Sequence, residues 1–127
     1  MKVLLSIKPE FADKIFDGSK KYEFRRSLFK NKSVKTVVLY ASYPVQQVVG
    51  EFEIDSILND GLKQLWDFTK EYSGITENFF YEYFQDKEKG YAIKIKRAKR
   101  YKKALSLKDD FNATPPQSFI YLKECLV

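Results

Sequence analysis

The segment 18–26, GSKKYEFRR, has the most specific chemical pattern of this chain, because cations, a carboxylate and aromatic rings alternate along it. In a strand, successive side chains point to opposite faces, so the two aromatic rings can enter a core while Glu23 and Arg25 project together from the other face. Lys20 follows a turn at Gly18, so this alternation does not fix its direction. The pattern indicates either a charged binding site or an edge strand with solvated charges.

The residue types limit the chemistry of such a site. The chain has no histidine and one cysteine, which excludes the usual zinc sites and the Ser-His and Cys-His nucleophile pairs. Catalysis would have to use lysine, carboxylates, tyrosine or hydroxyls. We expect neither a metal nor another cofactor.

Basic residues outnumber acidic ones by 23 to 17, and the net charge of +6 indicates either a polyanionic partner or simple solubility. The charges are unevenly distributed: residues 94–103 hold seven basic and no acidic side chains, whereas residues 51–88 hold ten acidic and three basic ones. We therefore expect a bipolar surface, on which the acidic region 51–88 could bind a protein. The candidates for contact with a nucleic-acid backbone are Lys94, Lys96, Arg97, Lys99 and Arg100.

A length of 127 residues fits one domain, 1–127, that buries enough surface to fold without disulfides. The single cysteine, Cys125, excludes an intramolecular disulfide, and the N-terminal apolar run is too short for a secretory signal. No apolar stretch approaches the roughly 20 residues that a membrane span needs. We expect a cytoplasmic protein without membrane association.

The elements that position these side chains can be predicted in chain order. A short strand over 2–7 precedes a helix that starts at Pro9 and ends at Gly18, and the next strand starts at Tyr22. Residues 34–41 are apolar on both faces, which is typical of a strand buried on both sides. Residues 46–57 alternate between apolar and polar, which indicates a half-exposed strand.

The hydrophobic period changes to a helical one after Asp60. We expect one helix that is capped by Asn59 or Asp60 and ends at Gly74, and a second helix that is capped by Thr76. The aromatic stripe expected to enter the core from this second helix is Phe79, Phe80, Tyr83 and Phe84. A strand from Gly90 and a last strand over 118–124 follow. This order predicts an α+β fold, as a small mixed barrel.

Six segments resemble a single family in the same order along the chain. Gly18-x-Lys20-x-x-Glu23-x-Arg25 resembles the GxKxxExR signature of the ASCH domains, which are members of the PUA-like superfamily of small β-barrels. The other similar segments are LSIKP at 5–9, YASYPV at 40–45, VGEF at 49–52, GYAI at 90–93 and PPQSF at 115–119. The resemblance covers nearly the whole chain.

The resemblance implies a PUA-like β-barrel with an N-terminal helix and a two-helix insertion packed on it. It also implies a cleft beside the first helix that is lined by the signature and receives RNA or a nucleotide. The ligand-binding residues that it transfers to this chain are Lys8, Lys20, Glu23, Arg25, Ser42, Gln117 and Ser118.

These residues have a functional and a structural interpretation. Arg25 can clamp a phosphate and Lys20 can supply a point charge, while Glu23 can accept a hydrogen bond from a base amino group. Alternatively, both cations only neutralise Glu23. Ser42 could be only a turn residue, and Gln117 could only bracket the backbone.

The family also includes enzymes. Some ASCH-like proteins remove the acetyl group of N4-acetylcytidine with a lysine, a nucleophilic threonine and a distant glutamate. Lys20 matches their lysine, but Glu23 stands at the position of the nucleophile and cannot perform the step of a hydroxyl. The hydroxyls that could replace it are Ser42, Ser118 and Thr114. Ribonuclease activity has been attributed to other relatives. The candidate catalytic residues that the resemblance implies are Lys20 and Glu23, and RNA cleavage without histidine would use lysine and glutamate as acid and base or a metal held by carboxylates such as Glu23 and Glu51, whose spacing is not distinctive.

We therefore expect a module that binds RNA or a nucleotide rather than an enzyme, with DNA as another candidate ligand. Bases in such a site are stacked or read at their edges. The candidate stacking residues, which could equally belong to the core, are Tyr22, Tyr43 and Tyr101. The alternatives are hydrolysis of a modified nucleoside such as N4-acetylcytidine, hydrolysis of RNA, and an adaptor that binds a protein through the region 51–88.

Overall fold

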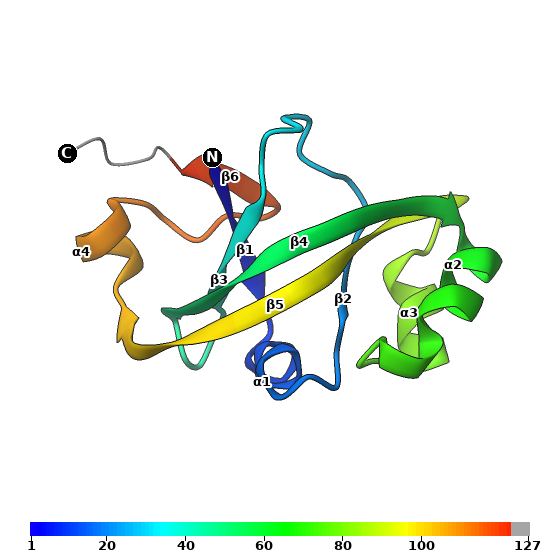
Figure 1. Ribbon diagram of the computed structural model, residues 1–127, viewed down its shortest axis with the longest axis horizontal. Helices are drawn as coiled ribbons and strands as arrows, with labels where there is room; N and C mark the ends of the chain where they lie inside the picture. The colour runs from blue at the N-terminus through cyan, green and yellow to red at the C-terminus, as the bar shows by residue number, and fades with distance from the viewer. Residues whose placement is uncertain (123–127) are drawn as a thin grey trace.

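Six strands form one sheet in the computed structural model, which describes residues 1–122 (Figure 1). The strands are β1 (Lys2–Ile7), β2 (Tyr22–Arg25), β3 (Thr36–Ala41), β4 (Gln47–Gly61), β5 (Lys89–Leu105) and β6 (Phe119–Leu122). They lie in the order β2-β5-β4-β3-β1-β6; β1 and β3 run parallel, and all other neighbours are antiparallel. The α+β class is confirmed. Because β2 and β6 remain as two edges, the sheet is not closed, and the predicted barrel is not confirmed.

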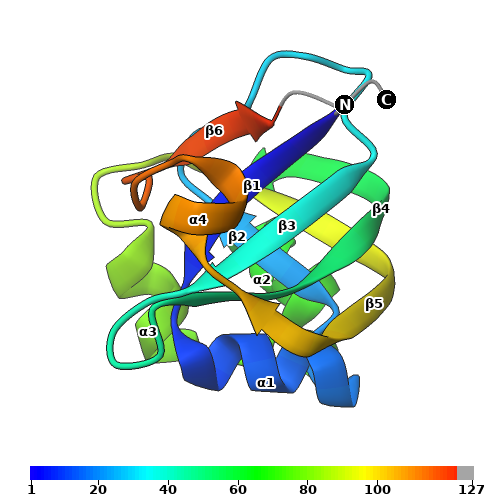
Figure 2. The ribbon, with the colours of Figure 1, turned by 90° about the vertical axis from the view of Figure 1, so that its left-hand side faces the viewer.

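The helices lie around this sheet (Figure 2). They are α1 (Pro9–Asp17), α2 (Leu62–Thr69), the short 3₁₀ helix η1 (Lys70–Tyr72), α3 (Glu77–Tyr83) and α4 (Leu107–Phe111). The first helix has the predicted boundaries, because proline is favourable in a first turn and Gly18 ends the helix with a left-handed φ of 88°. The helix ends directly before the signature and so determines where Lys20 enters the molecule.

The centre of the sheet is buried on both faces, as the apolar run at 34–41 predicts. Val37 and Leu39 of β3 belong to the hydrophobic cluster under α1, whereas Val38 and Tyr40 belong to a cluster on the opposite face near α4. All four side chains are at most 4% exposed. This strand therefore forms a rigid base for the neighbouring site.

Strands β4 and β5 extend beyond the other strands, and α2 and α3 lie at their far end (Figure 1). Strand β4 continues past the predicted end at residue 57, because residues 57–61 pair with residues 89–93 of β5. The predicted cap at Asn59 or Asp60 is therefore wrong: both residues lie in the strand, and Gly61 precedes α2 without a side-chain cap. The cap at Thr76 is confirmed, since its hydroxyl accepts the Phe79 N–H at 3.1 Å.

The two-helix insertion packs on β2 and β5 through a core of its own. The buried members of this second cluster are Tyr22, Phe24, Leu65, Trp66, Phe80, Phe84 and Ala92. The ring of Phe80 lies 5.1 Å from Trp66 and 4.9 Å from Phe84, between centroids, in tilted and edge-on arrangements that aromatic rings prefer. The insertion is thus attached to the back of the strand that contains the signature.

The C-terminal part contains one helix that the sequence pattern did not indicate to us. Ser106 caps α4 by accepting the Asp109 N–H at 3.1 Å. The last strand, β6, starts at Phe119, and residues 123 and 124 of the predicted strand, like Cys125, lie outside the described residues. None of the helices described is long and apolar enough to cross a membrane.

Candidate functional site

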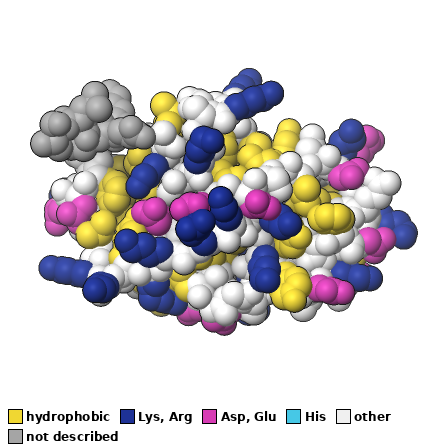
Figure 3. Space-filling model, viewed as in Figure 1, with side chains coloured by type: hydrophobic (Ala, Val, Ile, Leu, Met, Phe, Trp, Pro, Cys, Tyr) yellow, Lys and Arg dark blue, Asp and Glu magenta, His cyan; other side chains and the backbone are white. Residues whose placement is uncertain are grey.

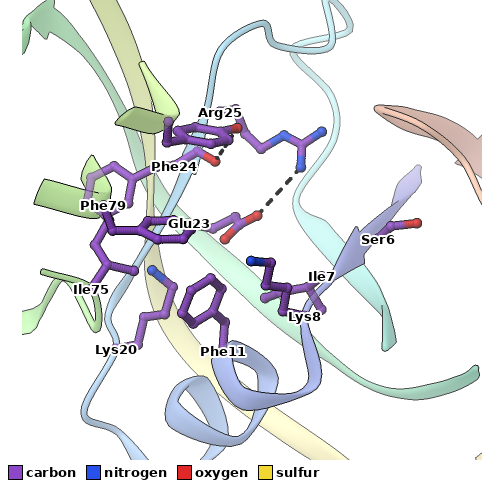
Figure 4. A pocket seen from close by; sticks show the side chains of 11 residues that line it. Ser6, Ile7, Lys8, Phe11, Lys20, Glu23, Phe24, Arg25, Ile75 and Phe79 are labelled. Carbon is purple, nitrogen blue, oxygen red and sulfur yellow. Dashed lines mark hydrogen bonds and ion pairs between the residues drawn. The ribbon is translucent and has the colours of Figure 1, made fainter. Parts of the chain in front are cut away.

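A pocket lies where β1, α1, β2 and α3 meet, and the signature residues line it (Figure 4). Its volume is about 550 Å³, including the open space at its mouth. Lys8, Lys20, Glu23 and Arg25, four of the seven predicted ligand-binding residues, are therefore brought together in one concave site.

Lys20 lies on the wall of the pocket and is only 2% exposed. Its Nζ donates a hydrogen bond to the Ser73 carbonyl oxygen at 2.6 Å and lies 4.9 Å from the ring centroid of Phe24. Burial lowers the pKa of Lys20 from 10.5 to about 8; the Glu23 carboxylate opposes this shift and Lys14 adds to it. Lys20 is therefore a better proton donor than an ordinary lysine, and its neutral form is accessible near neutral pH.

The loop before α3 holds Lys20 in place. Lys14 donates to the Gly74 carbonyl oxygen at 3.0 Å, one residue after the carbonyl that holds Lys20. Gly74 has a φ of 70°, and a Cβ added there would lie 2.6 Å from the Lys20 side chain. Position 74 therefore needs glycine both for its backbone conformation and for the close approach of Lys20.

Glu23 and Arg25 project from the same face of β2, as predicted, and form an ion pair at 3.6 Å. Although β2 is an edge strand, Glu23 is only 7% exposed, so the alternative of solvated charges is wrong. Burial raises the pKa of Glu23, while the charges of Lys20 and Arg25 oppose this shift. Arg25 also donates from Nη2 to the Ser118 carbonyl oxygen at 2.8 Å, which fixes its guanidinium between β2 and the segment before β6.

The apolar wall of the pocket is formed by α1 and α3, where the rings of Phe11 and Phe79 meet edge-on at 5.4 Å between centroids. Phe80 and Phe84 are fully buried as predicted, whereas Phe79 and Tyr83 are only partly buried and line the pocket, although Tyr83 also packs against the second cluster. The sequence spacing could have indicated this difference, because residues 79 and 83 lie on one face of a short helix and residues 80 and 84 lie on the adjacent face. Our sequence prediction assigned both faces to the core.

The other predicted ligand-binding residues do not line the pocket. Ser118 lies next to it and contacts Arg25. The Ser42 N–H donates to the Ile7 carbonyl oxygen at 2.9 Å, and Ser42 starts the turn after β3, in agreement with its structural interpretation. Gln117 is exposed, and Thr114 lines a separate groove beside α4.

Two of the three candidate stacking tyrosines are engaged elsewhere. Tyr22 is buried in the second cluster, and Tyr101 donates its hydroxyl proton to Glu51 at 2.7 Å, so neither presents a free ring. Tyr43 is 81% exposed in the loop after β3. Glu51, which we considered with Glu23 as a metal ligand, is not in the pocket but pairs with Lys2 at 3.6 Å.

The basic strand over 94–103 is partly neutralised by acids of β4 and of α1. The ion pairs are Lys94–Asp55 at 3.6 Å, Arg97–Glu53 at 3.4 Å and Arg100–Asp13 at 2.9 Å. Of the five predicted backbone contacts, Lys96 and Lys99 have no acidic partner in the described part of the chain. On the face that Figure 3 shows, the two signs of charge are intermixed, so the predicted bipolar surface is not seen there.

Comparison with known proteins is consistent with this architecture. The chain is 27% identical to the "ASCH domain-containing ribonuclease" of Zymomonas mobilis over 126 residues, which cover 95% of this chain and 84% of that protein. It is 28% identical to the large ribosomal subunit protein uL22 of Ureaplasma parvum over 122 residues, but spans only 39% of that protein's length.

The solved structures give the same result for the fold. The crystal structure of ASCH from Zymomonas mobilis superimposes with a TM-score of 0.85 at 27% identity, over 97% of this chain and 88% of that one. A mutant of the same protein gives a TM-score of 0.88 over 97% and 89%. The ASCH domain model matches residues 5–104. This chain therefore belongs to the ASCH domain family.

Proposed function

We propose that this protein binds RNA and holds one nucleotide in the pocket between α1 and α3. The observation that supports this most directly is the fixed arrangement of Lys20, Glu23 and Arg25 in a concave site with aromatic walls. Cations recognise phosphate, a carboxylate recognises base amino groups, and aromatic rings provide faces for bases. The name of the Zymomonas mobilis relative, a ribonuclease, supports RNA as the ligand.

In this proposal each residue has a distinct role. Arg25 is held by Glu23 and Ser118 and binds a phosphate without first having to be ordered, which lowers the entropic cost of binding. Glu23 accepts a hydrogen bond from a base amino group. Lys8, which lies 5.1 Å from the ring centroid of Phe79, adds an exposed cation at the pocket mouth.

Fluorescence anisotropy with short single-stranded RNA and DNA of the same sequence tests the proposal at two salt concentrations. Arg25→Gln should weaken RNA binding roughly 10- to 100-fold, because it removes a charge-assisted contact. Arg97→Gln is the matched control, since it removes the same charge from the exposed ion pair between Arg97 of β5 and Glu53 of β4. Millimolar affinity of the wild-type protein at low salt, or equal effects of both variants, would contradict nucleotide binding in the pocket.

A second candidate function is cleavage of RNA. It is favoured by the opposite pKa shifts of two neighbouring groups, since burial makes Lys20 a stronger acid and Glu23 a stronger base than usual. Glu23 would take the proton of a ribose 2′-hydroxyl while the 2′-oxygen attacks the phosphorus of the adjacent phosphodiester. The bond to the 5′-oxygen breaks, and Lys20 protonates that oxygen, leaving a 2′,3′-cyclic phosphate and a 5′-hydroxyl.

Incubation of end-labelled RNA with wild-type protein and with Lys20→Met tests this reaction. We expect products with 2′,3′-cyclic phosphate ends from the wild type and a loss of at least about 100-fold in rate with the variant. Cleavage that is unchanged in Lys20→Met would exclude this mechanism. The same two proteins are incubated with N4-acetylcytidine to test the deacetylase alternative, and release of cytidine is measured. We expect no release, because Glu23 does not supply the nucleophilic hydroxyl of that reaction. Release by the wild type that is lost in Lys20→Met would support a deacetylase.

A further inference from the structure

A second hollow lies beside the end of β2, against the turn that follows α3, and has a volume of about 900 Å³ including its open space. Its charged lining is formed by four cations, Arg26, Lys30, Lys87 and Lys89, and one acid, Glu88. None of them belongs to the GxKxxExR signature or to the basic strand over 94–103. We refer to this hollow as the Arg26 groove.

Arg26 is fixed in this groove by the backbone. Its Nη1 donates to the carbonyl oxygens of Tyr83 and Gln85, both at 2.9 Å, at the C-terminal end of α3. Its Nε and Nη2 groups have no hydrogen-bond partner among the described residues. A guanidinium that is held by one nitrogen and exposes the others can bind a phosphate with little further loss of side-chain entropy.

The cations of the groove differ from those of the basic strand over 94–103. Lys87 and Lys89 are exposed, and none of the four cations of the groove pairs with a carboxylate within residues 1–122. In the basic strand, three of the seven cations, Lys94, Arg97 and Arg100, pair with an acid. A smaller share of the positive charge is therefore compensated by ion pairs in the Arg26 groove than in the basic strand.

The groove and the pocket share no lining residue, but they are adjacent through one dipeptide and one tyrosine. Arg25 lines the pocket, and Arg26, the next residue, lines the groove. The side chain of Tyr83 lines the pocket, and its carbonyl oxygen holds Arg26. An RNA strand that leaves the pocket past the end of β2 can therefore reach the groove.

We propose that the Arg26 groove binds the phosphodiester backbone of the nucleotides adjacent to the one in the pocket. This inference rests on the proposed binding of RNA in the pocket. It adds the path of the RNA strand, from the pocket into the Arg26 groove. The phosphates contact Arg26, Lys87 and Lys89. Two neighbours in the groove suit a following nucleotide: the half-buried ring of Tyr91 offers a stacking face, and the exposed Asn59 amide can bond to a base edge.

The test compares two double variants that remove the same charge. Lys87→Gln/Lys89→Gln changes the groove, and Lys96→Gln/Lys99→Gln changes two unpaired cations of the basic strand over 94–103. Anisotropy is measured with a short single-stranded RNA and, by competition, with a ribonucleoside monophosphate. We expect the groove variant to weaken RNA binding about tenfold and to lower the salt slope by roughly 0.7 for each lost contact, with unchanged affinity for the monophosphate.

The possible outcomes distinguish an error in the proposed RNA path from an error in the proposed binding of a nucleotide in the pocket. If RNA binds and Arg25→Gln weakens it, but the groove variant binds like wild type, the path is wrong and the proposed function stands. A larger loss with the β5 variant than with the groove variant overturns the path in the same way. If the wild type binds no RNA, the proposed function fails and the path with it. Arg26→Lys keeps the charge but loses the planar guanidinium with its several N–H donors. It should weaken RNA binding and leave the affinity for the monophosphate unchanged.

Discussion

The pocket and the ladder of ion pairs between β4 and β5 use the same side-chain types in opposite environments. Glu23 and Lys20 are almost fully buried, and burial shifts the pKa of each toward neutrality. The side chains of the ladder pair Arg97 and Glu53 are 68% and 46% exposed. Water screens such a pair, which typically contributes about 0–1 kcal/mol.

This difference shows why the number of charges is a poor guide to a binding site. The ladder and the pocket have four charged side chains each, but those of the ladder lie in solvent as two pairs of opposite sign. The fold keeps Lys20, Glu23 and Arg25 in a place where desolvation makes each interaction stronger. Four predictions test this contrast, from the largest expected effect to the smallest.

Gly74→Ala should have the largest effect on stability, roughly 4 kcal/mol, because it combines a strained left-handed backbone with a clash against Lys20. Urea denaturation measures the loss. Gly18→Ala is the matched control, since Gly18 also has a positive φ but no atom within 4 Å of an added Cβ. It should cost only about 1–2 kcal/mol. Equal losses in the two variants would show that the packing of Lys20 contributes little.

The stability of the protein should rise between pH 8 and pH 10.5 because of Lys20. Below pH 8 the folded and unfolded chains both hold this proton, whereas above it only the unfolded chain does until pH 10.5, so the folded state gains. The full gain is roughly 3 kcal/mol. Denaturation at several pH values, with Lys20→Met as the reference for all other titrating groups, isolates the contribution. Parallel pH profiles of the two proteins would exclude it.

Glu23→Gln should lower the pKa of Lys20 below about 8, because it removes the carboxylate that stabilises the ammonium while the burial remains. The pH dependence of the Lys20 side-chain NMR signal measures this shift. In the ladder, Glu53→Gln should leave the signal of Arg97 and the melting temperature nearly unchanged. An unaltered pKa of Lys20 would mean that the two pocket charges are not coupled.

The smallest effect is expected for the ladder. The coupling free energy between Arg97 and Glu53, from a double-mutant cycle with glutamine at both positions, should be below about 1 kcal/mol and should decrease at high salt. Thermal or urea denaturation of the four proteins gives this value. A coupling of several kcal/mol that persists in salt would remove the distinction between the ladder and the pocket.

Features that depend on local sequence were predictable. Pro9, Gly18 and Thr76 mark helix ends through backbone chemistry that acts within a few residues. The alternation in the signature likewise predicted that Glu23 and Arg25 share a face, and the family resemblance indicated a site beside the first helix. These inferences needed no knowledge of which strands are neighbours.

Features that depend on pairing were not predictable in the same way. Glu53 lies opposite Arg97 because of the register between β4 and β5, which shifts at irregularities that the sequence does not mark. Asp60 has a good capping side chain, but pairing with Gly90 keeps it in the strand. The place of Phe79 in the pocket depends on how α3 docks, and this docking is set by the second cluster.

The edge-on contact between Phe11 and Phe79 has a consequence for local unfolding. Phe11 packs on the cluster under α1, and Phe79 belongs to the helix attached to the second cluster, so the pocket exists only while both clusters are docked. Opening of the insertion alone would therefore abolish the pocket and leave the central strands intact. A bound nucleotide would slow hydrogen exchange in α3 more than in β3. Binding would therefore increase the time for which the insertion stays docked on the sheet.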